Sequence, residues 1–125
     1  MILGTGVDLA EVSRIQKSIE RYGDRFLARV FTPAERAYAE RKKNRFERYA
    51  ARFAAKEAGM KALGTGWKGG VTWRDFEVAN LPGGRPTLRL SGKAAELAAR
   101  LGVKSISLSL SHTGNLAIAQ VILEN

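Results

Sequence analysis

Apolar and polar residues follow two different periods along the chain, and the changes of period divide it into helical and extended stretches. The opening ILGTGVDL is predicted as a short strand with Asp8 at its C-terminal end. From residue 11 to about residue 30, apolar residues recur with the period of a helix. Gly23 and Asp24 lie inside this stretch, where we expect them to break or kink the helix. The apolar stripe consists of Val12, Ile15, Ile19, Tyr22, Phe26 and Val30.

Two further helices are predicted in the first half. The segment TPAE, residues 32–35, supplies an N-cap threonine, a proline at the first helical position and a glutamate that completes a capping box. We therefore expect a helix over 33–42. After a short turn, the Ala-rich stretch predicts a longer helix over about 46–63, which Gly64 ends in the C′ position.

The second half alternates with the period of strands. VTWRDFEVANL and the segment after GGRP are predicted as two strands joined by a turn at 82–84. Ser91 is expected to cap a helix over 92–101, which Gly102 ends. KSISLSLSH and NLAIAQVIL are predicted as a second hairpin with HTGN at its turn. The sequence thus predicts an α+β fold with a largely antiparallel sheet packed against helices, in one domain spanning residues 1–125.

Composition narrows the function classes. The chain contains no cysteine, which excludes a thiolate nucleophile and a disulfide framework and suits the reducing cytoplasm. The N-terminus lacks the basic region of a signal peptide, and no apolar run approaches the roughly 20 residues of a membrane span. Lysine and arginine total 21 against 12 acidic residues, a net charge of +9, which predicts an anionic partner without choosing one.

Three charged residues are the first candidates for chemistry. Glu57 and Lys61 have the i, i+4 spacing of an ordinary surface pair, and Asp8 alone is an ordinary turn or cap residue. However, Phe53 shares the helix face of Glu57 and Lys61, and small residues surround it, as in a closely packed helix side. In combination, two carboxylates and a lysine are suited to hold Mg²⁺ together with a phosphate.

Three weaker signals accompany this cluster. His112, the only histidine, ends a strand at a predicted turn and is either structural or part of a site. Ser107, Ser109 and Ser111 share one face of their strand, as ordinary patterning or as the lining of a polar groove. The segment GTGWKGG from Gly64 onward is either a helix stop or a phosphate-holding loop, although it lacks the P-loop spacing.

Several motifs together resemble a known family. GTGVDLAEVSRI, RFAAKEAGMKALGTG, WRDFEV followed by GGRP, and SLSHTGNLAIAQVI occur in order over nearly the whole chain. They are similar to the holo-[acyl-carrier-protein] synthases, the small bacterial 4′-phosphopantetheinyl transferases. The resemblance implies transfer of 4′-phosphopantetheine from coenzyme A to a serine of apo acyl carrier protein, with release of adenosine 3′,5′-bisphosphate. It also implies a homotrimer with active sites between subunits, and neither nucleic acid nor membrane as a partner.

The resemblance also implies roles for individual residues. Asp8 and Glu57 match the family's Mg²⁺ ligands, and Lys61 matches a lysine near the phosphates of coenzyme A. The general base is either Glu57 or a metal-bound water held by Asp8. Other residues match segments that surround coenzyme A: Gly64, Thr65, Gly66, Pro86, Ser109, His112 and Thr113.

Arginines recur on the side of the predicted 11–30 helix opposite its apolar stripe, and the resemblance gives this basic stripe a meaning. Acyl carrier proteins are acidic, so the stripe is either a solvated surface or a docking site that raises the association rate. Gly59 departs from the family's larger side chain; glycine costs about 1 kcal/mol in a helix and allows close packing. The predicted docking residues are Arg14, Arg21, Arg25 and Arg29.

Two rival functions remain open at this point. The excess of basic residues also suits a nucleic-acid-binding module, although no RNP motif, zinc finger or KH loop is present. A regulator that binds coenzyme A without catalysis has the same binding residues as the enzyme. Transfer activity separates the enzyme from both alternatives.

Overall fold

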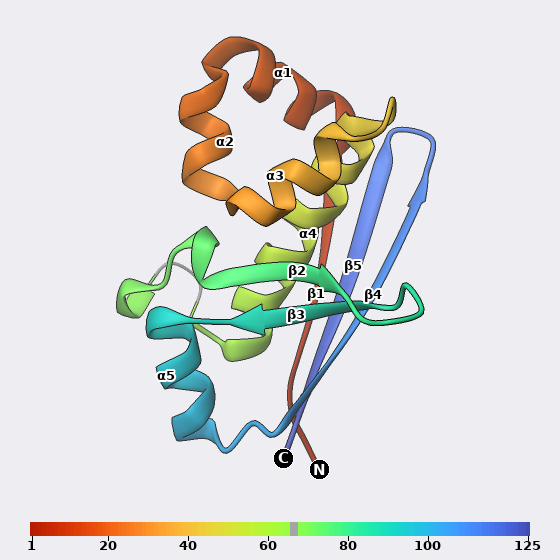
Figure 1. The fold of residues 1–125 in the computed structure, drawn as a ribbon. Helices are drawn as coiled ribbons and strands as arrows, with labels where there is room; N and C mark the ends of the chain where they lie inside the picture. The colour runs from red at the N-terminus through yellow and green to blue at the C-terminus, as the bar shows by residue number, and fades with distance from the viewer. Residues whose placement is uncertain (66–67) are drawn as a thin grey trace.

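The computed structural model describes residues 1–65 and 68–125. Three antiparallel strands form the larger sheet in the order β1 (Ile2–Glu11), β5 (Leu116–Glu124) and β4 (Ser105–Thr113). Helix α4 (Arg45–Leu63) runs along this sheet, and the two chain termini lie side by side at one end (Figure 1). The first strand therefore pairs with the last, and the 19-residue helix between them forms the centre of the core.

Glycines in β1 let this strand approach α4 unusually closely. A Cβ atom at Gly6 would lie 1.9 Å from the carbonyl oxygen of Ala58, and one at Gly4 would lie 2.1 Å from that of Ala62. Only glycine fits such contacts, because no larger residue tolerates them without a backbone shift. Because side chains alternate along a strand, Asp8 shares the helix-facing side of β1 with Gly6.

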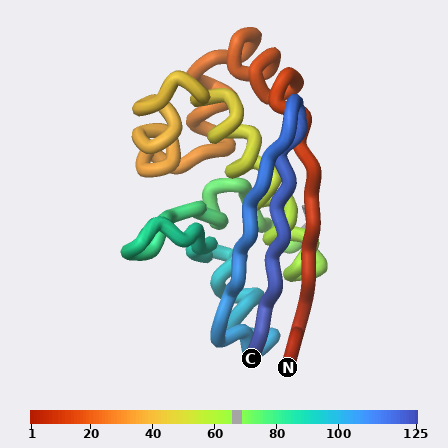
Figure 2. Tube along the Cα trace, turned by 90° about the vertical axis from the view of Figure 1, so that its right-hand side faces the viewer, coloured from red at the N-terminus to blue at the C-terminus, as the bar shows by residue number. Residues whose placement is uncertain are grey.

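The predicted helix over 11–30 is two helices, α1 (Val12–Tyr22) and α2 (Asp24–Val30). Gly23 separates them with a φ of 54°, a conformation that glycine adopts without strain. The break changes which side chains enter the core: Tyr22 is exposed, whereas Leu27 is buried. Figure 2 shows these helices and α3 (Pro33–Glu40) gathered at one end of the three strands.

The helix starts and stops are mostly those that the sequence predicts. The capping box of α3 is present, with the Thr32 and Glu35 side chains each accepting a bond from the other's backbone N–H. Gly64 follows α4 in the left-handed conformation. At Gly59, a Cβ atom would lie 2.9 Å from the side chains of Phe76 and Leu88, which explains the glycine by close packing.

The second half forms a small separate sheet and a helix. β2 (Phe76–Asn80) and β3 (Pro86–Leu90) pair as the predicted hairpin, and α5 (Gly92–Leu101) follows. The strand predicted over 71–81 is too long, because residues Trp73–Asp75 form the short helix η2 after another, η1 (Lys68–Gly70). Ser91 precedes α5 without a side-chain capping bond; the Asp75 carboxylate accepts one from the Ala94 N–H instead (3.3 Å).

The observed elements confirm a mixed fold of helices and antiparallel strands. Within the described residues, no helix is long and apolar enough to cross a membrane.

Candidate active site

The side chains of Asp8 and Lys61 meet between β1 and α4. Lys61 Nζ lies 2.8 Å from Asp8 Oδ1 and donates a second hydrogen bond to the Val7 carbonyl (3.1 Å). Asp8 is mostly buried while the Lys61 side chain is exposed, so the pair opens to solvent on the lysine side. The prediction that Asp8 ends its strand is wrong, because β1 continues to Glu11.

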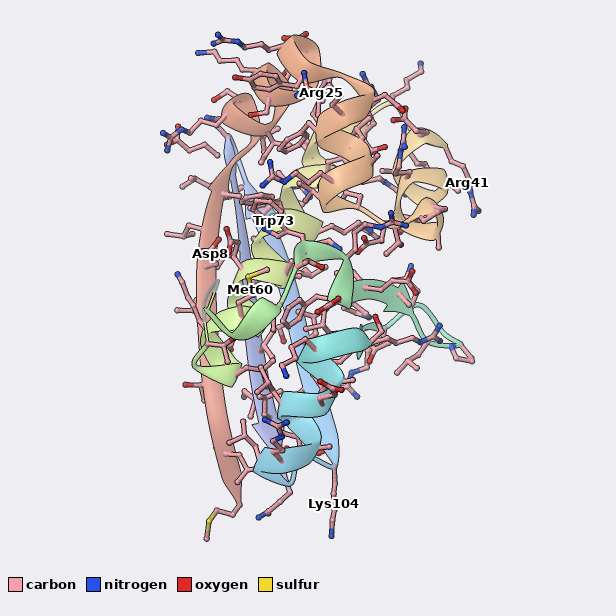
Figure 3. The ribbon with its side chains drawn as sticks, turned by 90° about the vertical axis from the view of Figure 1, so that its left-hand side faces the viewer. Asp8, Arg25, Arg41, Met60, Trp73 and Lys104 are labelled. Carbon is pink, nitrogen blue, oxygen red and sulfur yellow. The ribbon has the colours of Figure 1, made fainter. Side chains whose placement is uncertain are left out.

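Glu57 lies next to this pair, one helical turn before Lys61. Burial raises the pKa of Glu57, and the negative charge of Asp8 raises it further, while the Lys61 ammonium and the Trp73 side chain oppose the shift. Two carboxylates from separate elements thus come close enough to repel each other. Figure 3 shows Asp8 and Trp73 on the same side of the molecule, from β1 and from η2.

This arrangement fits a hard divalent cation. A cation between Asp8 and Glu57 would offset the repulsion that raises the pKa of Glu57. Within residues 1–65 and 68–125, no group of three or more metal-ligating side chains occurs. Mg²⁺ commonly takes one or two carboxylates and completes its shell with water and substrate phosphates. The donor set therefore suits a cation that arrives with a phosphate ligand.

The segment after α4 begins one turn beyond Lys61. Gly64 is exposed, with a φ of 77° and open space where a side chain would project, and Thr65 is half-buried. Gly66, the third predicted residue of this loop, lies outside the described residues. The described part of the loop is thus placed at the Lys61 end of the carboxylate pair.

The remaining predicted residues lie away from this cluster within one chain. Pro86 begins β3, and β5 separates β4 from β1. Ser109 and Thr113 are exposed on β4, and the alternation of side chains places Ser109 on the face opposite the buried Leu108. His112 is on the helix-facing side of β4 by the same alternation, but at least two strand spacings, about 10 Å, from β1.

His112 lines a hollow that the sequence does not reveal. The hollow has a volume of about 200 Å³ and lies between β4, α3 and the first half of α4. Arg48 and Arg52 stack their guanidinium groups on the ring of Tyr38, at 4.3 and 4.1 Å from its centroid. Arg52 is buried, and its Nε has no hydrogen-bond partner in the described part of the chain. In the sequence, only the i, i+4 spacing of Arg48 and Arg52 indicates that they lie together, and this spacing does not show that they face β4.

The break at Gly23 divides the basic stripe between two helices. All four arginines predicted to dock a partner are exposed. Arg25 and Arg29 line a hollow of about 280 Å³ with Tyr22 and Phe26. Arg29 also lies over the Trp73 ring, 5.7 Å from its centroid, which links this surface to the neighbourhood of Glu57.

Comparison with known proteins identifies the class. The profile of the 4′-phosphopantetheinyl transferase superfamily matches residues 4–121. The chain belongs to this superfamily.

More particular relatives are found over the full length. The chain is 70% identical to the holo-[acyl-carrier-protein] synthase of Solibacter usitatus and 62% identical to that of Koribacter versatilis, each over 100% of both chains. The crystal structure of the Neisseria meningitidis holo-[acyl-carrier-protein] synthase matches with a TM-score of 0.91, 31% identity and full coverage of both chains. The Helicobacter pylori enzyme in complex with coenzyme A matches with a TM-score of 0.82 and 30% identity, over 96% of this chain and 99% of that one. The chain is accordingly an enzyme of the phosphopantetheinyl transferase class.

Proposed function

We propose that the enzyme transfers 4′-phosphopantetheine from coenzyme A to a serine hydroxyl of an apo acyl carrier protein, with Mg²⁺. The serine oxygen forms a bond to the β-phosphorus, the bond between this phosphorus and the bridging oxygen breaks, and adenosine 3′,5′-bisphosphate leaves. The observation that carries the proposal is the convergence of Asp8, Glu57 and Lys61 from β1 and α4. The coenzyme A complex of the Helicobacter pylori relative supports the choice of donor.

The three residues supply what phosphoryl transfer requires, which is mainly position and charge. Asp8 and Glu57 would hold the cation, which would supply positive charge to offset the negative charge on the leaving phosphate. Lys61, with an exposed side chain, presents its ammonium to the diphosphate. The serine proton would pass to Glu57 or to a metal-bound water held by Asp8, both within the same carboxylate pair. No nucleophile of the enzyme is needed, since the attacking hydroxyl belongs to the carrier.

The site is completed by a neighbouring copy in our proposal. Lys61 and residues 64–66 bind coenzyme A from one subunit, while Pro86, Ser109, His112 and Thr113 approach from the next. This division is supported by the separation of β4 from β1 within one chain. It also gives the hollow beside His112 a use, because the two guanidinium groups of Arg48 and Arg52 that line it suit a phosphate.

An exposed apolar face supports the proposed homotrimer. The side chains of Val7, Leu9 and Ile118 are 52%, 60% and 37% exposed and lie on the sheet face that points away from α4. Adjacent large apolar residues on a sheet face are typical of an interface. We expect light scattering to give three times the chain mass for the native protein. Leu9→Asp should give monomers, which lack the neighbouring subunit's part of the active site and are therefore inactive.

The basic stripe is the proposed docking site for the carrier. Arg14, Arg21, Arg25 and Arg29 are all exposed, and Arg29 lies over the ring of Trp73. An acidic partner would associate faster with such a surface, and the gain would fall with salt.

Cytoplasmic location stays a prediction from the cysteine-free composition.

The experiment is a mass measurement on the carrier. With coenzyme A and Mg²⁺, the apo carrier gains about 340 Da, the mass of the transferred arm. Omission of the metal abolishes the gain. Coenzyme A binding without any gain, across carriers, pH and metals, would instead identify a non-catalytic binder and contradict the proposal. Salt-sensitive RNA binding without coenzyme A binding would favour the nucleic-acid alternative.

A further inference from the structure

Lys56 is fully buried in the core, although its neighbour Glu57 faces the site. Its ammonium lies 2.6 Å from Glu35 Oε1 and donates hydrogen bonds to the carbonyls of Trp73 (3.2 Å) and Phe76. An ammonium has three donors, and these three partners use all of them. A lysine is mostly found at the surface, so a fully buried and fully bonded one has a specific structural task.

The Glu35 carboxylate is equally well bonded. Its Oε1 accepts a hydrogen bond from the Thr32 N–H (2.9 Å), and its Oε2 accepts one from the Val78 N–H (2.8 Å). A buried ion pair contributes little net stability compared with apolar residues of the same volume. The pair instead fixes positions. Lys56 on α4 and Glu35 on α3 bind the backbone of Trp73, Phe76 and Val78, before and within β2.

Two of the three Lys56 bonds hold the turn that carries Trp73. The indole of Trp73 lies 6.0 Å from the Phe53 ring, centroid to centroid, and under the guanidinium of Arg29 at 5.7 Å. Phe53 is one turn before Glu57 on the same helix face. Trp73 therefore stands between the helix face that bears Glu57 and the basic stripe on α2.

We propose that Lys56 is a positioning residue for the transfer reaction, which fixes the Trp73 indole between the Glu57 face of α4 and Arg29. The role rests on the proposed function, since it concerns the alignment of a docked carrier with the carboxylates. Without the Lys56 bonds, the carbonyls of Trp73 and Phe76 lose their buried donor and the turn is free to shift. Misplacement by about 1 Å is enough to reduce a rate by up to about 100-fold.

The test replaces the whole pair, Lys56→Met with Glu35→Gln, so that neither charge of the pair is left without the other. The control makes the same two changes at the exposed pair Lys93–Glu96, whose charged atoms are 3.4 Å apart. Below the melting temperature of every variant, we expect kcat to fall about 10- to 100-fold for the buried pair. The KM for coenzyme A should change little, and the control should stay within about twofold of the native kcat.

A second variant tests the link through Trp73. Trp73→Ala should show a similar loss of kcat, and adding it to the Lys56/Glu35 replacement should cause little further loss, because both remove one arrangement. Native kcat in a folded Lys56/Glu35 variant would overturn the proposal. So would a combined variant whose loss of kcat equals the product of the two separate losses. If that variant does not fold, native kcat in Trp73→Ala overturns it and a loss at unchanged melting temperature supports it.

Fluorescence separates this inference from the proposed function. In a Trp67→Phe background, Trp73 is the only tryptophan. Its emission should move to longer wavelength when the buried pair is replaced and not when the surface pair is. A native enzyme without transfer activity would contradict the proposed function, whereas unchanged Trp73 emission would contradict the positioning role.

Discussion

Lys56 and Glu57 are neighbours in α4, yet their charges lie in opposite kinds of surroundings. Lys56 is buried with a partner for each of its three donors. Glu57 is half-buried beside a second carboxylate, and its pKa is raised as a result. Consecutive helical residues point about 100° apart, so one turn of helix serves both sides. The difference shows that a buried charge with a full set of partners fixes structure, while a half-buried carboxylate beside a second one is suited to bind a cation.

The two clusters also depend on different parts of the chain. The buried pair joins α4 to α3 and β2, which lie near in sequence. The carboxylate pair joins α4 to β1, almost 50 residues away, and the glycines of β1 permit the approach. Trp73 links the two clusters, since its carbonyl accepts a bond from Lys56 and its side chain is hydrogen-bonded to Glu57.

The largest expected effect is on activity, from removal of either carboxylate. Asp8→Ala and Glu57→Ala should each reduce transfer at least about 1,000-fold, because each removes one of the two carboxylates proposed to hold the cation. Circular dichroism should show an intact fold in both. Activity near the native rate in either folded variant would remove that residue from the proposed site.

The next effect is on stability, from breaking the buried pair on one side. Lys56→Met alone leaves Glu35 charged in the core and should lower the free energy of unfolding by about 3–5 kcal/mol. The double change with Glu35→Gln should lower it less, since no unpaired charge stays. Denaturant unfolding measures both, and equal losses in the single and double variants would show that the charges do not interact.

A third change moves Asp8 without altering any charge. Gly6→Ala would place a Cβ atom 1.9 Å from the Ala58 carbonyl oxygen, so β1 must shift away from α4. We expect a loss of about 1–3 kcal/mol in stability, together with weaker Mg²⁺ binding by calorimetry. Thr5→Ala, at the neighbouring exposed position, should change neither. Native Mg²⁺ affinity in Gly6→Ala would show that the close approach does not set the metal site.

A fourth change tests the proposed docking stripe at its two residues on α1. Arg14→Glu with Arg21→Glu should raise the KM for the carrier about tenfold at low salt, with less effect at high salt. The kcat at saturating carrier should stay near the native value. Arg100→Glu, an exposed arginine on α5, is the control. An equal rise in KM from the control would show that overall surface charge, and not the stripe, attracts the carrier.

The smallest effect is a gain in stability at the carboxylate pair. The raised pKa of Glu57 means that the folded protein binds this proton more tightly than the unfolded chain. Its contribution to stability therefore falls as the pH rises through the folded pKa and stays unfavourable above it. Without metal, Glu57→Gln should raise the Tm by about 2–4 °C at pH 7 and by less at pH 4. A lower Tm at pH 7 would contradict the repulsion.

Local signals in the sequence predicted most elements correctly. The capping box at Thr32 and the left-handed Gly64 need only neighbouring residues, so their sequence patterns suffice. The short helix η2 has a local signal too, the capping box of Thr72 and Asp75, but the alternation of apolar residues around it favours a strand. The ammonium of Lys56 also holds its backbone from another element. No period along the chain reveals a bond to another element.

The residues of the candidate site were predictable from the sequence, but their distances from one another were not. Asp8, Glu57 and Lys61 were recognised from their motifs, and their meeting depends on a strand–helix contact that the glycines of β1 permit. The distance between His112 and this cluster was not predictable, because it depends on β5 lying between β4 and β1. The hollow lined by Arg48 and Arg52 was not predictable either, because it depends on the packing of α3 and α4 against β4.

The central claim is that Asp8 and Glu57 share one cation that also binds the diphosphate of coenzyme A. The most direct measurement is a crystal structure with coenzyme A and Mn²⁺, located by its anomalous scattering. We predict one Mn²⁺ in contact with both carboxylates and with an oxygen of the diphosphate. A cation bound away from either carboxylate, or a diphosphate bound elsewhere on the protein, would contradict the claim.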